Sequence, residues 1–181
     1  MRLYEGTVGE FKRDVLNNEI ADIVAKNYLE KIQRKVNESE YRSCESSLRV
    51  LKDSLDTPEL INNKIVIEYK LPYSERRIDI VLFGKSIDNK DTIVIIELKQ
   101  WSNNSVKDTE IEGNLEIDYG NHISQSEHPC FQVEAYVIDM NDFIKVFQDT
   151  PKIELWWVVF TVIIIPEQKI QFCMLKSFKM Q

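Results

Sequence analysis

The 181-residue sequence is poor in cysteine, histidine, glycine and proline, and each shortage excludes a class of protein. Three widely spaced cysteines with no CxxC pair exclude a disulfide framework and a cysteine-based zinc site. Two histidines are too few for a histidine-based metal cluster. Five glycines and five prolines exclude collagen-like and low-complexity chains, so the composition is that of an ordinary globular domain.

Long hydrophobic runs are also missing. The longest apolar stretch, residues 155–165, is about half the length that a membrane span requires. The first residues of the sequence lack the apolar segment of a signal peptide. We therefore expect a single domain over residues 1–181, located in the reducing cytoplasm and without a membrane partner.

Basic residues are also fewer than acidic ones. The chain has 23 Lys and Arg against 30 Asp and Glu, a net charge of −7. Such a balance argues against a protein that coats nucleic acid or anionic membrane through charge alone. It leaves open an enzyme that acts on nucleic acid with acidic residues in its site, whose affinity for substrate should then be modest and metal-dependent.

Hydrophobic periodicity predicts an α/β fold with a mixed sheet, in the order helix, helix, three strands, helix and two strands. Because short connections join the three central strands, we expect an antiparallel meander, to which a helical crossover then returns the chain. The expected helices span residues 8–36, 39–57 and 129–148, and the expected strands span 64–71, 77–83, 92–99, 153–165 and 169–175.

Local residue types set these boundaries. Ser39 is expected to cap the second helix, with Glu40 in its first turn, and Gly84 is expected to end the second strand. Pro129 suits the first turn of the last helix. The polar residues 102–128 are expected to form one long loop, which in a compact domain is usually functional or mobile.

Three charged residues interrupt the two most apolar of the central strands. Asp79 lies within the run RIDIVLF, and Glu97 and Lys99 follow directly after Ile93–Ile96. Side chains alternate along a strand, so Glu97 and Lys99 share a face and lie roughly 6.6 Å apart along it. Burying such charges is costly unless they pair with each other or bind a cation.

Two carboxylates on neighbouring strands suit Mg²⁺, which keeps open positions for water and phosphate oxygens. Such an ion polarises a phosphodiester and lowers the pKa of a bound water, and Lys99 could orient that water or offset transition-state charge. The alternative is an edge position with a surface ion pair, since so short a motif often occurs by chance. A solvated face, however, predicts alternation along the whole strand, and Ile93–Ile96 has none.

The ordered segments Ile67-Glu68-Tyr69, Arg77-Ile78-Asp79 and Glu97-Leu98-Lys99-Gln100-Trp101 resemble the PD-(D/E)XK nuclease superfamily. More narrowly, they look like the nuclease-like domain found ahead of superfamily-1 helicase modules in some bacterial proteins. Gln132 and Tyr136, four residues apart and hence on one helix face, resemble the QxxxY element of RecB-like nucleases. The resemblance covers residues 10–148 and implies a restriction-endonuclease-like α-β-β-β-α-β core with an extra N-terminal helix.

The resemblance also implies roles for six residues. Asp79 and Glu97 would be metal ligands, Glu40 would help to hold the metal or its water, and Lys99 would be the catalytic lysine. Gln132 and Tyr136 would position the DNA strand or the lysine. The cofactor would be Mg²⁺, with Mn²⁺ as a substitute.

Structural alternatives exist for the outer residues of this set. Glu40 could serve only the helix dipole, and Tyr136 could be ordinary core packing. Glu68 is interpreted mainly as a solvated or paired residue, with metal support as the second reading. Arg76 and Arg77 could contact phosphate or simply be surface arginines.

The leading hypothesis is therefore a Mg²⁺-dependent nuclease acting on DNA, with RNA left open as a substrate; a role in defence or repair follows only from the resemblance. The sequence has no GxxxxGK[ST] phosphate loop, so a stand-alone domain, one truncated from a helicase fusion, a helicase partner and a homodimer all stay open. A second hypothesis is a nuclease-fold binding or regulatory module that does not cleave or needs a partner. A purely structural domain is the least favoured, because it makes every motif a coincidence.

Overall fold

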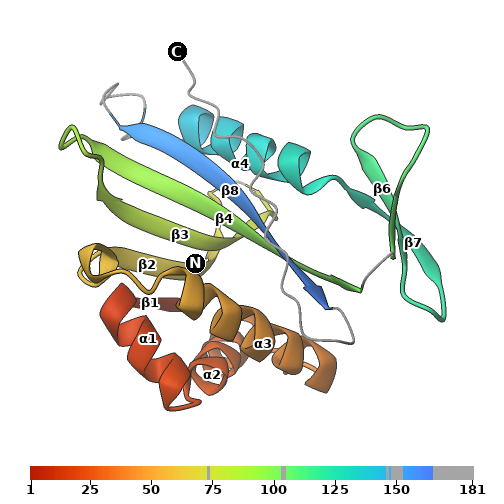
Figure 1. The fold of residues 1–181 in the computed structure, drawn as a ribbon, viewed down its shortest axis with the longest axis horizontal. Helices are drawn as coiled ribbons and strands as arrows, with labels where there is room; N and C mark the ends of the chain where they lie inside the picture. The colour runs from red at the N-terminus through yellow and green to blue at the C-terminus, as the bar shows by residue number, and fades with distance from the viewer. Residues whose placement is uncertain (73, 103–104, 146, 148–152, 165–181) are drawn as a thin grey trace.

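A five-stranded mixed sheet lies at the centre of the computed structural model, which describes residues 1–72, 74–102, 105–145, 147 and 153–164 (Figure 1). The strand order is β1-β2-β3-β4-β8, and a separate three-stranded sheet has the order β5-β6-β7. The first sheet comprises β1 (Tyr4–Thr7), β2 (Lys64–Lys70), β3 (Arg77–Lys85), β4 (Asp91–Ser102) and β8 (Glu154–Ile164). The helices are α1 (Val8–Leu16), α2 (Ile20–Ile32), α3 (Glu38–Ser54) and α4 (Pro129–Phe143).

The connectivity confirms the predicted meander and crossover. Strands β2, β3 and β4 are successive antiparallel neighbours, and β8 lies parallel to β4. A parallel neighbour requires a long crossover connection, and α4 supplies it. The described chain is thus a mixed α/β structure built on a mixed sheet. None of its described helices has both the length and the apolar character needed to cross a membrane.

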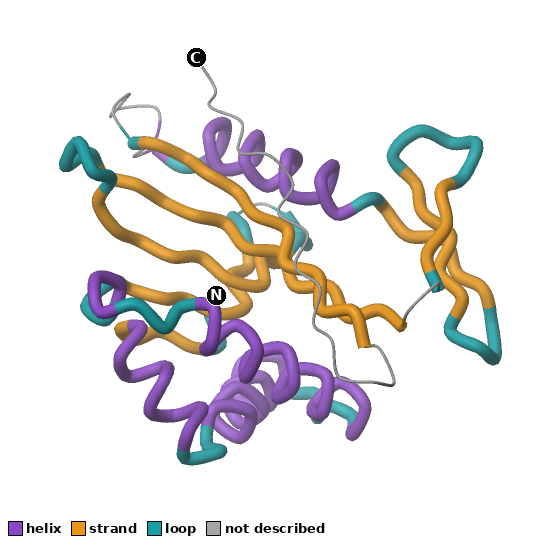
Figure 2. Tube along the Cα trace, in the orientation of Figure 1, coloured by secondary structure: helices purple, strands orange, loops and turns teal. Residues whose placement is uncertain are grey.

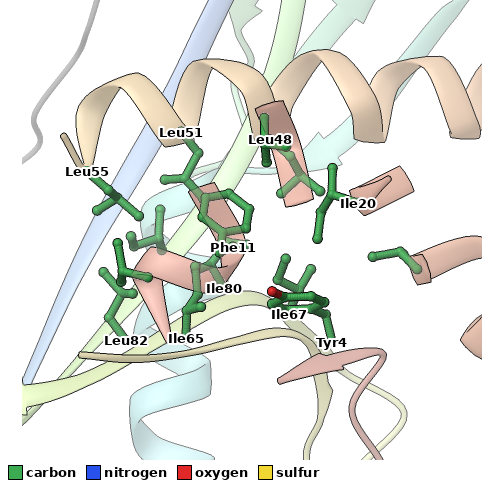
Figure 3. Close-up of a cluster of buried hydrophobic side chains, with 14 of the residues drawn as sticks. Tyr4, Phe11, Ile20, Leu48, Leu51, Leu55, Ile65, Ile67, Ile80 and Leu82 are labelled. Carbon is green, nitrogen blue, oxygen red and sulfur yellow. The ribbon is translucent and has the colours of Figure 1, made fainter. Parts of the chain in front are cut away.

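Helices cover both faces of the sheet and create two hydrophobic cores. On one face, α1, α2 and α3 place Phe11, Ile20 and Leu51 over Ile65 and Ile80 of the sheet (Figure 3). On the other face, α4 packs a stripe against Val81, Ile95 and Val159. This stripe contains Val133, Tyr136, Val137 and Met140, all buried. Strands β2, β3 and β4 are therefore packed between the two cores.

The N-terminal helical region is two helices, so the prediction of one helix over residues 8–36 is wrong. The chain breaks after Leu16, where Asn18 adopts a left-handed conformation with φ of 62°, and α2 ends at Ile32 before Gln33 with φ of 59°. Asparagine tolerates this conformation better than most residues. The break is invisible to periodicity because the apolar spacing continues on both sides of it.

Three further boundaries differ from prediction. Helix α3 is capped by Asn37 rather than Ser39, because Asn37 and Glu40 form a reciprocal capping box. Strand β3 continues through Gly84 to Lys85, and a Cβ atom at residue 84 would displace the amide end of the Asn63 side chain. Helix α4 begins at Pro129 as predicted but ends at Phe143; the predicted end near residue 148 and the predicted strand over 169–175 lie outside the described residues.

The predicted long loop over residues 102–128 is instead mostly β-structure. Strands β5 (Val106–Asp108), β6 (Asn114–Asp118) and β7 (Ile123–Glu127) form a sheet that projects beside the central one, hereafter the β-arm, residues 105–127 (Figure 2). The loop prediction was wrong because these strands are short and polar: of their apolar side chains only Leu115 and Ile117 are buried. β1, at the edge next to β2, was likewise too short to predict.

The packing of α3 on the sheet predicts a large difference between two leucines. Leu51→Ala should lower the free energy of unfolding by about 2–5 kcal/mol, because Leu51 is 1% exposed and its loss leaves a cavity. Leu29→Ala on α2 is the control, since Leu29 is 43% exposed and should cost less than about 1 kcal/mol. Urea denaturation followed by circular dichroism measures both values, and equal costs would contradict the described core.

Candidate metal centre

Side chains along β2 and β3 alternate between the two faces of the sheet, and this pattern shifts at Glu68 in β2 and at Asp79 in β3. Ile65 and Ile67 face the core under α1–α3, whereas Tyr69, also odd-numbered, packs against the core under α4. The residue between them, Glu68, has a left-handed backbone with φ of 55°, which rotates the strand out of its regular alternation. Asp79 is the residue of β3 opposite Glu68 in the β2–β3 register, and Ile78 and Ile80 on either side of it face different cores.

This phase change opens the sheet to a cavity on each side. Glu68, Arg77 and Asp79 line both a cavity of about 490 Å³, walled by α3, and one of about 360 Å³, walled by α4. A regular strand would present each of these side chains to one face only. The distortion therefore lets Asp79 line a cavity on each side of the sheet.

Asp79 and Glu97 form a carboxylate pair on adjacent strands. The β3–β4 register pairs Ile80 with Ile96, and its continuation by one step places Asp79 opposite Glu97. One Asp79 oxygen accepts a hydrogen bond of 2.8 Å from the Leu98 backbone N–H. Glu97 is 2% exposed, and its Oε2 has no hydrogen-bond partner among the described residues. The register places the two carboxyl groups side by side on adjacent strands, so a proton or a cation between them would satisfy both.

Burial and mutual repulsion make this pair reluctant to ionise. Burial, followed by the negative charge of Asp79, raises the pKa of Glu97 to about 7, although Lys99 opposes the shift. Burial also raises the pKa of Asp79, against the Leu98 N–H and the positive charges of Lys99 and Arg77. Both carboxylates would be stabilised in the ionised form by an additional positive charge.

Lys99 is held by a chain of polar contacts that reaches α4. Its Nζ lies 2.7 Å from Glu97 Oε1 and donates a hydrogen bond of 2.9 Å to Gln132 Oε1. Gln132 in turn donates through Nε2 to the Tyr136 hydroxyl. Tyr136 is 2% exposed, and burial first and the charge of Glu97 second raise its pKa. The structure thus brings together five of the predicted residues, Asp79, Glu97, Lys99, Gln132 and Tyr136.

The local sequence of α4 explains how Gln132 and Tyr136 reach this position. The His128 side chain caps the helix by accepting from the Cys130 N–H, and Pro129 occupies its first turn. The helix therefore starts one turn before Gln132, and residues 132 and 136 stack on the same face, beside the buried stripe. Tyr136 is both core packing and part of the polar chain.

Glu40 lies further out than the other predicted ligands. It lines the 490 Å³ cavity together with Glu68 and Asp79. Its carboxylate accepts from the Asn37 backbone N–H at 3.3 Å, as the third residue of the α3 capping box. This capping-box hydrogen bond supports the interpretation of Glu40 as a helix-end residue. A role of Glu40 in metal binding stays a prediction.

Glu68 is a stronger functional candidate than its interpretation as a solvated or paired residue implied. It forms an ion pair of 3.5 Å with Arg77, whose guanidinium lies 5.6 Å from the centre of the Tyr28 ring. Burial and the charge of Asp79 raise the pKa of Glu68 to about 7. The ion pair agrees with the interpretation of Glu68 as a paired residue. Its left-handed backbone could not be predicted from the sequence, because glycine is the residue that usually marks such a conformation.

The residues present fit a hard divalent cation with few protein ligands. No group of three or more His, Cys, Asp or Glu side chains in the described part of the chain is arranged to hold a metal ion. Mg²⁺ does not require one, because it is often bound by one or two carboxylates and completes its shell with water and phosphate. The unpartnered Glu97 Oε2 and the neighbouring Asp79 are such a pair.

Comparison of this chain with protein-family models, with curated proteins and with solved structures finds no match. The arrangement of these side chains is therefore what points to a function.

The raised carboxylate pKa values predict that, without divalent cations, the free energy of unfolding falls as the pH rises from about 4.5 to about 7.5. A folded-state pKa of Glu97 near 7, above the ordinary 4.5, means that the folded chain binds the proton more tightly. The stabilisation is present at the acidic end and is lost as the pH rises through 7. Thermal unfolding in the presence of a chelator measures this slope.

Glu97→Gln should reduce that slope without abolishing it, because Glu68 titrates in the same range and the pKa of Asp79 is also raised. Mg²⁺ added at about pH 8 should raise the melting temperature of the wild type and not of Glu97→Gln. A variant with the wild-type slope would contradict the assignment of the shift to this pair.

Glu68→Gly and Glu68→Ala should differ in stability although both remove the same carboxylate. Glycine adopts the φ of 55° freely, whereas alanine keeps the strain, so the glycine variant should be more stable by about 1 kcal/mol or more. Urea unfolding of the two variants measures the difference. Equal stabilities would mean that residue 68 does not need a left-handed backbone.

Proposed function

We propose that this chain is a Mg²⁺-dependent nuclease that hydrolyses phosphodiester bonds in DNA. The observation that carries the proposal is the Asp79–Glu97 carboxylate pair, with one buried oxygen that lacks a partner, beside the ammonium group of Lys99. Two carboxylates on adjacent strands can hold a Mg²⁺ ion that keeps open positions for water and phosphate, and the nearby lysine can offset negative charge, so the arrangement suits metal-dependent phosphodiester cleavage.

Each residue has a distinct task in such a reaction. Asp79 and Glu97 would hold the cation, which when bound supplies Lewis-acid polarisation of the phosphate and a lowered pKa of water. Lys99 lies on the same face as Glu97 and would offset the negative charge that develops on the phosphate. Gln132 and Tyr136 fix the direction of the lysine side chain, which otherwise has four rotatable bonds.

The order of elements supports a place in the PD-(D/E)XK superfamily. The succession α3, β2, β3, β4, α4 and β8 corresponds to the α-β-β-β-α-β order of the restriction-endonuclease-like core that the motifs imply. In this assignment α1 and α2 are the additional N-terminal part, and the two metal-binding carboxylates come from β3 and β4. Glu40 on α3 would face the metal across the larger cavity.

The surroundings of the pair offer room for a nucleic-acid strand. A third cavity, of about 580 Å³, adjoins the 490 Å³ cavity through Ser39 and Ser43 and is also lined by Arg42 and Trp101. Arg76 and Arg77 line the cavity on the α4 side. Hydroxyl and guanidinium groups are typical contacts of the phosphate backbone, so the strand would run from α3 across Asp79 towards α4.

Cleavage assays test the proposal directly. Purified chain with Mg²⁺ or Mn²⁺ should cut DNA, and Asp79→Ala or Lys99→Ala should lower the rate by at least about a hundredfold. Lys85→Ala is the matched control, because Lys85 forms an ion pair with Asp91 at the far end of the same two strands. It should cut at the wild-type rate, and all three variants should keep their circular dichroism spectra.

If single-stranded and double-stranded DNA and RNA all remain uncut, the enzyme proposal fails. Retained binding of DNA or of a protein partner would then favour a nuclease-fold module without its own cleavage activity. Calorimetry separates the cases further, since that module need not bind Mg²⁺ through Asp79 and Glu97.

A further inference from the structure

The outer edge of β7 is an open strand edge. The β-arm has the order β5-β6-β7, so β7 has a neighbour on one side only within the described residues. The ladder pairs Leu115 with Ser126 and Ile117 with Ser124. The hydrogen bonds Tyr119 N to His122 O and His128 N to Gly113 O set the phase of this ladder.

These two hydrogen bonds show which backbone groups of β7 bond to β6 and which lie on the open edge. Pairs two residues apart exchange hydrogen bonds in an antiparallel ladder, so Ser124 and Ser126 bond to β6. Asp118 N donates to Ser105 O on the other side of β6, which agrees with this assignment. The N–H groups of Ile123, Gln125 and Glu127 therefore point outwards, and the carbonyls of Gln125 and Glu127 accept only long bonds of 3.4 Å from neighbouring serine hydroxyls.

Among the described residues, this edge lacks several common protections against strand addition. Natural edge strands are commonly shielded by lysine, proline, a bulge or a covering segment. The sequence of β7, ISQSE, has neither lysine nor proline, and no bulge interrupts its register with β6. Ile123, at 62% exposed, and the nearby Tyr119, at 55%, add apolar surface. An unprotected edge with apolar neighbours indicates a binding surface for an extended segment.

The charge of the β-arm restricts what can bind there. Residues 105–127 contain six acidic side chains and one lysine, so these 23 residues carry −5 of the net −7. A second copy of β7 would bring an equally acidic arm against the first, and a nucleic-acid strand would bring phosphates. Both are repelled, whereas a basic segment is attracted.

We propose that the outer edge of β7 binds an extended, arginine- or lysine-rich segment of a protein partner, which adds a strand to the β-arm. The inference goes beyond the proposed nuclease activity and does not depend on it. Backbone hydrogen bonds to Ile123, Gln125 and Glu127 supply part of the binding, and the acidic residues of the arm select the charge. The basic partner would also supply positive charge near a site whose own chain is acidic.

The position of this edge relates it to the candidate metal centre. Glu127, the last residue of β7, lines the same cavity as Asp79, Gln132 and Tyr136. The next residue, His128, caps the helix that carries Gln132. A segment bound along β7 therefore ends at the mouth of that cavity.

Fluorescence anisotropy with a ten-residue peptide of alternating arginine and valine tests the proposal on the full chain. The peptide should bind the wild type, and a peptide of alternating glutamate and valine should not. Gln125→Pro removes an outward N–H without breaking the β6–β7 ladder, so it should weaken binding about tenfold. Gln125→Ala, which keeps the N–H, is the control and should bind like the wild type.

Charge is tested by reversal at matched sites. The double variant Glu112→Lys/Glu116→Lys in the arm should weaken binding, whereas Glu30→Lys/Asp88→Lys, with the same change of net charge outside the arm, should have little effect. As a second measurement, the arginine–valine peptide methylated on alternate backbone nitrogens should bind more weakly than the unmodified one.

Equal binding by Gln125→Pro together with equal binding of the methylated peptide would overturn strand addition. Equal weakening by both double variants would overturn the role of the arm. Self-association, or binding of a single-stranded oligonucleotide, that Gln125→Pro abolishes would assign the edge to a different occupant and also overturn the proposal.

Discussion

The close approach of the Asp79 and Glu97 carboxyl groups on adjacent strands is the constraint around which the site is organised. Two negative charges in a place largely closed to water repel each other, and each resists ionisation, as the raised pKa values express. Replacing buried charged groups by hydrophobic residues of similar volume is often neutral or stabilising. Lys99 compensates part of this negative charge through its ion pair with Glu97 Oε1. The other oxygen of Glu97, Oε2, has no hydrogen-bond partner among the described residues. The fold thus keeps an electrostatic cost that a cation would relieve.

The rest of the fold places and supports this pair. Two cores, one on each face of the sheet, hold β3 and β4 in register up to the residues before the carboxylates. At that point the left-handed Glu68 on β2 shifts the alternation and turns Asp79 towards two cavities. Backbone strain in a strand is costly, and it commonly persists where a site needs a particular geometry. Its position directly opposite Asp79 is what connects the distortion to the site.

The sequence could predict the parts of this arrangement that local patterns encode. The runs around Asp79 and Glu97 are continuous apolar strands, and Pro129 with the Val133, Val137 and Met140 stripe indicates α4, so the carboxylates, Lys99 and the Gln132–Tyr136 spacing were all recognisable. Other features depend on structure that periodicity does not record. The break at Asn18 keeps the helical spacing, the β-arm has only two buried apolar side chains in its strands, and the φ of Glu68 leaves no mark in residue types. The register of β2, β3 and β4, which sets the three carboxylates side by side, is a property of the sheet rather than of any one strand.

The central claim is that Asp79 and Glu97 together bind a divalent cation. Crystals of the chain soaked in Mn²⁺, with diffraction data collected at the manganese absorption edge, test it most directly. The account predicts one anomalous peak within about 2–2.5 Å of an oxygen of each carboxylate, and no such peak in crystals of Asp79→Asn. A wild-type map without a peak between the two side chains, with Lys99 bonded to both carboxylates in its place, would contradict the account.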